Sequence, residues 1–184
     1  MKVKRKKQGR PRISEKKLEN TYIIQTAKSL ILSECKVPSI RKLASELNVD
    51  PMAIYYYFPN KQAVLEAITI SLIGEIYAPN PIVSWRENLM SLCKSYLELL
   101  ASYPDLLQII LSVPAEGPTS IFQERFETAI EKLNLAENKK KIVMSVLIDY
   151  IHGFSLASHG CISIDLTDAP LNFIFDALEK SHLK

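Results

Sequence analysis

An all-α fold is what this 184-residue sequence predicts, and three observations predict it. Apolar residues recur three and four positions apart in one segment after another, which is the spacing of an amphipathic helix. Prolines and asparagine-containing turns separate these segments, and no alternating strand pattern with hairpin turns interrupts them. Because 47% of the residues are hydrophobic, the chain can bury a substantial core between packed helices.

A basic arm precedes the first predicted helix. Residues 1–13, MKVKRKKQGRPRI, contain seven Lys and Arg and no acid, so this segment cannot pack on itself and should be disordered when free. The helix is expected to start with Ser14 as its N-cap and to run to about Glu34, before Val37-Pro38 ends the pattern. Its predicted apolar face consists of Leu18, Tyr22, Ile23, Ala27, Leu30 and Ile31.

A helix, a tight turn and another short helix come next. Ser39 can cap the first of these helices, and Asn48 can end it because asparagine tolerates the left-handed conformation. Asp50 can then cap the following helix, with Pro51 at the first helical position, where its missing N–H costs nothing. The apolar stripe of the first helix consists of Ile40, Leu43, Ala44 and Leu47.

The rest of the chain also has helical spacing. Phe58-Pro59 should end the third helix, and Asn60 can cap a fourth over about residues 61–76. Ala-Pro-Asn-Pro at residues 78–81 has the composition of a linker. Further helices are predicted over residues 84–102, 104–112, 118–133, 137–158 and 170–182.

The charge of the chain is divided unequally between its two parts. Residues 1–61 carry 14 Lys and Arg against 5 Asp and Glu, whereas residues 62–184 carry 9 against 15. The net charges are therefore +9 and −6, although the whole chain is only +3. A basic segment without a basic amphipathic helix favours nucleic acid over a membrane as the partner of the first part.

Length and hydropathy argue against a membrane protein. No stretch reaches the roughly 18 apolar residues that a transmembrane helix requires. The basic amino terminus runs into a charged, helix-like segment, which does not fit a secretory signal. We expect a cytoplasmic protein that does not bind membranes.

Catalytic, cofactor and metal sites are not expected. The sequence has no nucleophile elbow, phosphate loop, HExxH motif or paired carboxylates, and it contains only five glycines. Cys35, Cys93 and Cys161 are far apart and form no CxxC pair, and His152 and His159 have no third ligand at metal-binding spacing. These patterns favour a binding protein over an enzyme.

The helix-turn-helix segment carries a family resemblance. SIRKLASELNVDPMAIYYYFPNKQAVLEAI resembles the amino-terminal signature of the tetracycline-repressor (TetR) family of bacterial transcription regulators. Asn48-Val49 replaces the usual Gly-Val of the turn, which is tolerable because asparagine also accepts positive φ. The residues that match the signature are Ser39, Arg41, Leu43, Ala44, Ile54, Tyr55, Tyr56, Tyr57, Phe58 and Lys61.

The three consecutive tyrosines point to DNA contact. Ile54 and Phe58 are four residues apart and should share the buried face, so at least two of the tyrosines must meet solvent or a ligand. The resemblance implies phosphate contact for Tyr55 and Lys61 and groove contact for Tyr56, whereas the side on which Tyr57 lies stays open. The complete predicted set is Ser39, Arg41, Lys42, Asp50, Pro51, Met52, Ala53, Tyr55, Tyr56, Tyr57 and Lys61, with Arg41 a candidate for guanine and Lys42 for phosphate.

The basic arm has two possible roles. Arg10-Pro11-Arg12 on an extended segment suits the narrow minor groove of A·T-rich DNA. A solvated tail that only raises non-specific affinity is an equally good reading. We include Arg10 and Arg12 among the candidate DNA-binding residues.

The second part of the chain resembles the ligand-binding and dimerisation domain of the same family. Trp85, the turn at residues 103–106 and the segment 150–154 carry this likeness, which implies a homodimer and a small-molecule effector. Residues 142–154 are apolar almost all the way round their helix, so they should be buried against a partner as well. For each single candidate the plain-core reading is favoured over a pocket role, and the candidate pocket residues are Tyr96, Leu99, Leu107, Ile110, Phe122, Phe126, Met144, Leu147 and His152.

The sequence thus predicts a ligand-responsive DNA-binding regulator. Residues 14–60 would form the helix-turn-helix domain, and residues 61–184 the ligand-binding and dimerisation domain, with residues 61–77 as its linker helix. A homodimer would bind a palindromic operator as a repressor and leave it when an effector binds. The alternative is a DNA-binding regulator without small-molecule control, either constitutive or switched by a protein partner.

Overall fold

The computed structural model describes residues 18–34, 36–103, 105–112, 118–158 and 164–182. This part of the chain contains helices and loops but no strand, which confirms the predicted all-α class. The α-helices are α1 (Asn20–Glu34), α2 (Ile40–Leu47), α3 (Pro51–Tyr57), α4 (Lys61–Ile73), α5 (Trp85–Ser102), α6 (Leu106–Ser112), α7 (Pro118–Ile130), α8 (Glu137–Ala157) and α9 (Asp168–His182), with 3-10 helices η1 (Glu131–Leu133) and η2 (Ile164–Thr167).

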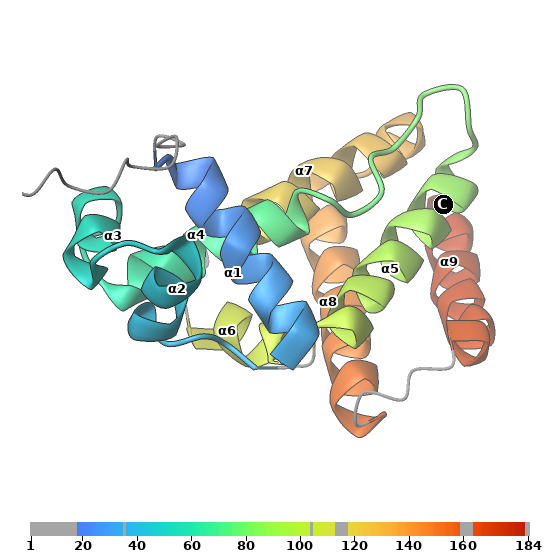
Figure 1. The fold of residues 1–184 in the computed structure, drawn as a ribbon. Coiled ribbons are helices and arrows are strands. Elements are labelled where there is room, and N and C mark those ends of the chain that lie inside the picture. The colour runs from blue at the N-terminus through green and yellow to red at the C-terminus, as the bar shows by residue number, and fades with distance from the viewer. Residues whose placement is uncertain (1–17, 35, 104, 113–117, 159–163, 183–184) are drawn as a thin grey trace, which may run out of the picture.

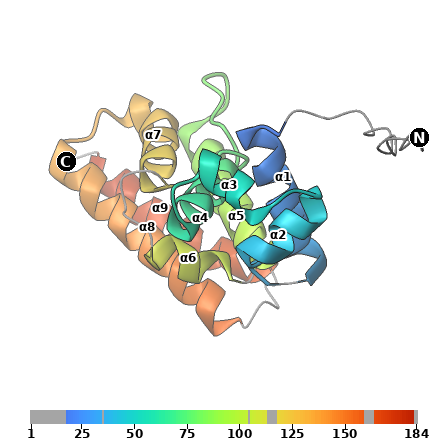
Figure 2. The same ribbon diagram turned by 60° about the vertical axis from the view of Figure 1, so that its left-hand side comes forward.

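The two ends of the molecule are built from different parts of the sequence. Helices α1, α2 and α3 lie at one end, and α5, α8 and α9 lie side by side at the other (Figures 1 and 2). Helix α4 packs against α1 on one side and against α6 and α7 on the other. A single cluster of buried apolar side chains runs through both ends, so α4 is the element that joins them.

The first helix is shorter than predicted. It begins at Asn20, whereas Leu18 and Glu19 are not helical, so the expected continuous helix from Ser14 is wrong. The Leu18 carbonyl instead accepts a hydrogen bond from the hydroxyl of Tyr57 on α3. Tyr22 is largely exposed because the 100° step places it at the edge of the face that buries Ile23. Ser14 and the arm of residues 1–13 lie outside the described residues.

The tight turn between α2 and α3 forms as its residue types predict. The Ser39 hydroxyl accepts a hydrogen bond from the Lys42 N–H at 3.1 Å, which caps α2. Asn48 is left-handed at φ 54°, and the Val49 N–H reaches back to the Ala44 carbonyl at 3.0 Å. This pair of features is a Schellman ending, and it places α3 at a defined angle to α2.

Helix α4 begins as predicted and ends earlier. The Asn60 side chain accepts from the Ala63 N–H at 2.8 Å and caps the helix. Its last helical residue is Ile73, not Ile76, because the guanidinium of Arg125 on α7 donates to the carbonyls of Ile73, Gly74 and Ile76. These carbonyls are satisfied without a further helical turn.

The remaining boundaries lie within two residues of the prediction, if η1 is counted as the end of α7. The predicted linker at residues 78–81 is a loop, tied down by the buried side chain of Asn88. That side chain donates to the Asn80 carbonyl at 2.9 Å and accepts from the Asn80 N–H and the Tyr77 hydroxyl, each at 2.9 Å. The loop is therefore fixed by hydrogen bonds.

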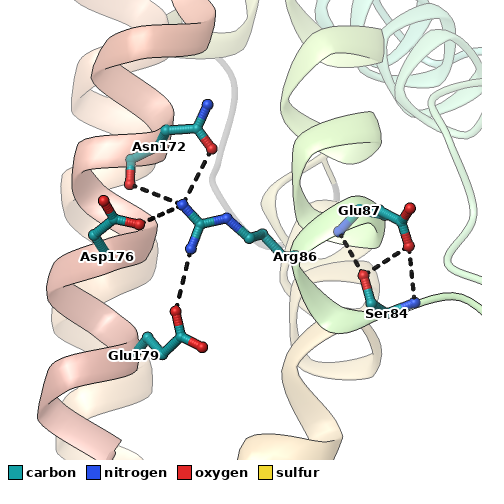
Figure 3. A network of polar contacts seen from close by, with 6 residues as sticks. All are labelled: Ser84, Arg86, Glu87, Asn172, Asp176 and Glu179. Atoms are coloured by element: carbon teal, nitrogen blue, oxygen red, sulfur yellow. Dashed lines mark hydrogen bonds and ion pairs between the residues drawn. The ribbon is translucent and has the colours of Figure 1, made fainter.

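One arginine joins α5 to α9. A capping box of Ser84 and Glu87 starts α5. Arg86 is the second residue of α5, and its side chain extends towards α9, where it pairs with Asp176 and with Glu179 at 3.3 Å (Figure 3). Phe175 on α9 is fully buried below this contact. Helix α9 is thereby held in one rotation about its axis, with its other face turned outward.

Candidate nucleic-acid interface and internal cavity

The outward face of α3 carries aromatic and apolar side chains. Tyr56 is 85% exposed, Met52 70% and Tyr55 38%, whereas Ile54 is completely buried and Phe58 nearly so. The two buried residues anchor α3 to the core, as their spacing predicts. The exposed residues stand on a helix of only seven residues, fixed at its start by the Asp50 cap and Pro51.

Tyr57 differs from its two neighbours. Its ring is half-buried, and its hydroxyl donates to the carbonyl of Leu18 just before α1. The rings of Tyr56 and Tyr57 meet edge to face, with centroids 5.2 Å apart. Tyr57 therefore supports the exposed ring of Tyr56 and joins α3 to the start of α1. Helical spacing alone could not assign Tyr57 to a side, because its partner lies 39 residues away.

The two capping residues among the predicted DNA contacts already have partners. The Asp50 carboxylate accepts from the Met52 N–H at 2.8 Å, and Ser39 caps α2. Both are exposed beside the helix-turn-helix turn. Pro51 and Ala53 are half-buried in the first turn of α3. These residues shape the backbone that presents Met52 and Tyr56.

The basic side chains near this surface differ in their surroundings. Arg41 on α2 and Lys61 at the start of α4 are both exposed. Lys42 lies 2.9 Å from the Glu34 carboxylate, and its hydrogen bond to that group raises the pKa of the Lys42 ammonium. A phosphate would therefore compete with Glu34 for Lys42. Arg10 and Arg12 lie outside the described residues.

A small internal cavity of about 50 Å³ lies where α4 to α8 meet. It is mainly apolar, and Tyr96, Thr119 and His152 supply its polar groups. The complete lining is Ile73, Tyr96, Ile110, Thr119, Phe122, Ile148 and His152, none of which carries a carboxylate, ammonium or guanidinium group.

The structure brings some of the predicted pocket residues together and separates others. Tyr96, Ile110, Phe122 and His152 line the cavity. The others pack elsewhere in the core: Leu99, Leu107, Phe126 and Leu147 are buried, and Met144 is half-buried. Three further lining residues are not among those predicted: Ile73, Thr119 and Ile148, the last of which lies one turn before His152 on the same helix.

A hydrogen-bonded pair forms the polar wall of the cavity. The Tyr96 hydroxyl lies 2.9 Å from Nε2 of His152, and Tyr96 is only 4% exposed. Burial raises the pKa of the Tyr96 hydroxyl. Burial also lowers the pKa of His152, against the opposing charge of Asp149. Both groups are therefore neutral at pH 7, and the pair places no net charge in the cavity.

An apolar groove runs between α8 and α9 on the outside of the molecule. Phe173 is 77% exposed and Ile142 61%, and both border a hollow of about 280 Å³. The other lining residues are Val143, Val146, Ile174, Ala177 and Leu178. The outer face of α8 is thus uncovered in a single chain.

The described residues form neither a metal-binding cluster nor a membrane-spanning helix. No group of three or more His, Cys, Asp or Glu side chains in this part of the chain is placed to hold a metal ion. No described helix is both long enough and apolar enough to span a membrane. Cys93 is completely buried, and this burial raises the pKa of its thiol to about 12.

Family comparisons match both parts of the chain. Residues 38–68 match the model of bacterial regulatory proteins of the tetR family. Residues 78–164 match the model of the tetracyclin repressor-like C-terminal domain. The two matched segments together span more than half of the chain, and they include the helix-turn-helix and every cavity-lining residue except Ile73.

Curated relatives are similar over part of their length. Tetracycline repressor protein class A from transposon 1721 of Escherichia coli is 33% identical over 94 residues, which are 48% of this chain and 43% of that protein. The HTH-type transcriptional repressor DrrR1 of Streptomyces coeruleorubidus is 27% identical over 122 residues, or 62% and 44% of the two chains. The chain spans less than half the length of these relatives.

Solved structures share the fold. Mycobacterium smegmatis BioQ superimposes with a TM-score of 0.71 at 21% identity, covering 88% of this chain and 98% of that one. An Acinetobacter baumannii TetR variant in complex with minocycline gives 0.72 at 23% identity, covering 90% and 99%. Streptomyces coelicolor ActR in complex with (S)-DNPA gives 0.75 at 18% identity, covering 89% and 98%. BioQ has also been solved with its double-stranded DNA operator.

Proposed function

The chain belongs to the tetracycline-repressor family of bacterial DNA-binding regulators, and we propose that it represses transcription as a homodimer bound to a palindromic operator. We further propose that a small-molecule effector releases it. The observation that carries the first proposal is the outward face of α3, with Tyr56 85% and Met52 70% exposed on a helix fixed at its start. Large aromatic and apolar side chains that are exposed next to each other on a rigid element are typical of an interaction site.

Operator recognition would use both polar and apolar contacts. The hydroxyls of Tyr55 and Tyr56 can donate to phosphate oxygens, while their rings and Met52 contact sugars and thymine methyls. Arg41 is the candidate for a bidentate contact to guanine, and Lys61 for a phosphate. Arg10 and Arg12 would add contacts in the minor groove or non-specific attraction to the backbone.

Dimerisation would cover the apolar groove between α8 and α9. A symmetric pair of chains can place α8 and α9 of one copy against those of the other, which buries Phe173 and Ile142 together. Two recognition helices related by a two-fold axis then read two half-sites about one helical turn apart. The uncovered outer face of α8 supports this part of the proposal.

Effector control would act through α4. Ile73 in its last turn lines the cavity, and Arg125 from the cavity-lining helix α7 holds the carbonyls at the same end. A ligand that favours one arrangement of these helices would shift the population of α4 tilts, and with it the separation of the two recognition helices.

One observation favours the alternative without small-molecule control. The cavity of about 50 Å³ is far below the roughly 300–1,000 Å³ of typical ligand pockets. Native mass spectrometry of protein purified from cells distinguishes the alternatives. A bound small molecule supports effector control, whereas its absence, together with operator binding that no cell extract relieves, supports a constitutive or partner-switched regulator.

Selection from randomised duplex oligonucleotides tests the DNA-binding proposal. The full chain should enrich a palindrome with half-sites about 10 base pairs apart, centre to centre. Sedimentation of the enriched duplex with the protein should give two chains, or a multiple of two, on each duplex. Enrichment of a single non-palindromic site bound by one chain would contradict the dimeric model.

A further inference from the structure

The cavity wall contains hydrogen-bonding capacity that no described residue uses. Tyr96 and Nε2 of His152 share one hydrogen bond at 2.9 Å. A tyrosine oxygen can donate one hydrogen bond and accept others, so this bond leaves further capacity on Tyr96. Since Tyr96 is 4% exposed and lines the cavity, bulk water has little access to that remaining capacity.

Whether Tyr96 can still donate or still accept a hydrogen bond depends on the tautomer of His152. If Nε2 accepts from the tyrosine, the Tyr96 oxygen can accept one more hydrogen bond from a ligand. If Nε2 carries the proton and donates, the Tyr96 hydroxyl is free to donate instead. A ligand hydroxyl can both donate and accept, so it satisfies Tyr96 in either case. A carbonyl oxygen can only accept, so it satisfies Tyr96 only when Nε2 donates and the Tyr96 hydroxyl is free to donate.

The other residues of the cavity wall determine the shape and charge of the ligand that fits. The Phe122 and Tyr96 ring centroids are 5.3 Å apart, and the His152 ring stands 5.8 Å from Tyr96. Three neighbouring rings favour contact with a flat or compact apolar body. None of the lining residues carries a full charge, so an ionised ligand would lose its hydration without gaining a counter-charge. Thr119 adds one neutral hydroxyl.

We propose that the cavity binds a compact, uncharged, largely apolar alcohol or phenol whose hydroxyl bonds to the Tyr96–His152 pair. This inference rests on the proposed effector control and names the chemical class of the effector. The cavity of about 50 Å³ is smaller than one aromatic ring requires, so occupation enlarges it. Binding therefore selects an arrangement of the surrounding helices different from the one described above.

Four probes with the same ring and carbon count test the proposal: benzyl alcohol, toluene, benzoate and benzylammonium. Titration calorimetry with the full chain at pH 7.5 should show benzyl alcohol binding about three- to tenfold more tightly than toluene, the effect of one net hydrogen bond. Benzoate and benzylammonium should bind at least tenfold more weakly than benzyl alcohol. Toluene binding as tightly as benzyl alcohol, a charged probe binding best, or no probe binding up to its solubility limit would overturn the proposal.

Two matched variants locate the binding site. Tyr96→Phe keeps the ring and should abolish the preference for benzyl alcohol over toluene. Tyr150→Phe removes a buried hydroxyl that has no hydrogen-bond partner among the described residues and that does not line the cavity, so the preference should persist. A preference that survives in Tyr96→Phe would exclude Tyr96 as the recognition group. If Tyr96→Phe does not fold, Thr119→Val serves as the second cavity variant, and the four-probe series with the natural chain still decides.

Operator binding is measured on the same samples, because the two proposals can fail separately. Preferential binding of benzyl alcohol with unchanged operator affinity would keep the ligand class and reject effector control by that class. Release of the operator by a charged probe that binds best would keep effector control and overturn the ligand class.

Discussion

Two surfaces with an exposed aromatic ring lie at opposite ends of the folded molecule, and they differ in the chemical groups around the ring. At the α3 end, Tyr56 is 85% exposed beside tyrosine hydroxyls and the basic residues Arg41 and Lys61. At the other end, Phe173 is 77% exposed in a groove whose lining is entirely apolar. The exposure of the two rings is similar, so exposure alone does not identify the partner.

The groups around each ring determine which kind of partner each surface can bind. Hydroxyls and cations can replace water around phosphate oxygens, so the α3 end suits a polyanion and its affinity should depend on salt. An apolar groove gains most from excluding water completely, which a second apolar surface does best.

The largest effect is expected at the α8/α9 groove. Phe173→Glu should place a charge in the proposed dimer interface and raise the dissociation constant of the dimer at least thirtyfold, or about 2 kcal/mol. Sedimentation velocity over a dilution series measures this constant. Leu111→Glu on α6, an exposed apolar residue outside the groove, is the matched control and should leave it unchanged. Equal dissociation constants for both variants and the natural chain would remove the groove from the interface.

The next effect is expected at the α3 surface. Tyr56→Ala should weaken operator binding about tenfold, or about 1.4 kcal/mol, and leave the melting temperature unchanged, because its ring is mostly in solvent. A gel-shift titration at fixed salt gives the affinity. Tyr56→Phe keeps the ring and removes the hydroxyl, so it should lose only part of the operator affinity that Tyr56→Ala loses. Unchanged affinity in Tyr56→Ala would place this side chain outside the interface.

A smaller effect is expected at Tyr57, where the change should lower stability and leave operator affinity almost unchanged. Tyr57→Phe removes the hydrogen bond to the Leu18 carbonyl and should lower the free energy of unfolding by about 1 kcal/mol. Urea unfolding of Tyr57→Phe and of Tyr56→Phe at matched concentration makes the comparison. Operator affinity of folded Tyr57→Phe should stay within about twofold of the natural chain. A large loss of affinity with unchanged stability would mean that the hydroxyl contacts DNA instead.

The smallest effect concerns His152 in the wall of the cavity between the two ends. Burial lowers the pKa of His152 below its ordinary value of 6.5, so the unfolded chain takes up a proton before the folded chain does. Stability is therefore complete above pH 6.5 and falls as pH decreases from 6.5 to the lowered folded value. Urea unfolding at pH 7.5, 6.0 and 5.0 should show this loss, and His152→Gln should show less of it. Identical pH dependence in the variant would assign the loss to other groups.

The features that could be predicted from the sequence are local ones. Ser39, Asn48, Asp50 and Asn60 act on backbone groups within a few residues of themselves, so residue type and spacing were sufficient to place each cap. Ile54 and Phe58 were assigned to the core for the same reason, because their spacing on one helix fixes the shared face.

The features that could not be predicted depend on distant partners. The start of α1 is set by Tyr57, 39 residues from Leu18, and the end of α4 by Arg125, about 50 residues on. Lys28 is buried on α1 and pairs with Glu75, which no helical pattern indicates. In the cavity, periodicity distinguishes inward from outward positions but cannot tell which inward side chains meet at a gap in the packing.

The bond from Tyr57 to Leu18 also limits where the basic arm can reach. It ties the backbone just before α1 to the end of α3, the helix proposed to contact the operator. Five residues lie between Arg12 and Leu18, so a fully extended chain spans at most about 20 Å from one to the other. A half-site one turn away lies about 34 Å along the duplex. In the proposed dimer, Arg12 would therefore contact the half-site that the α3 of its own chain occupies, and each chain would read its half-site with both elements.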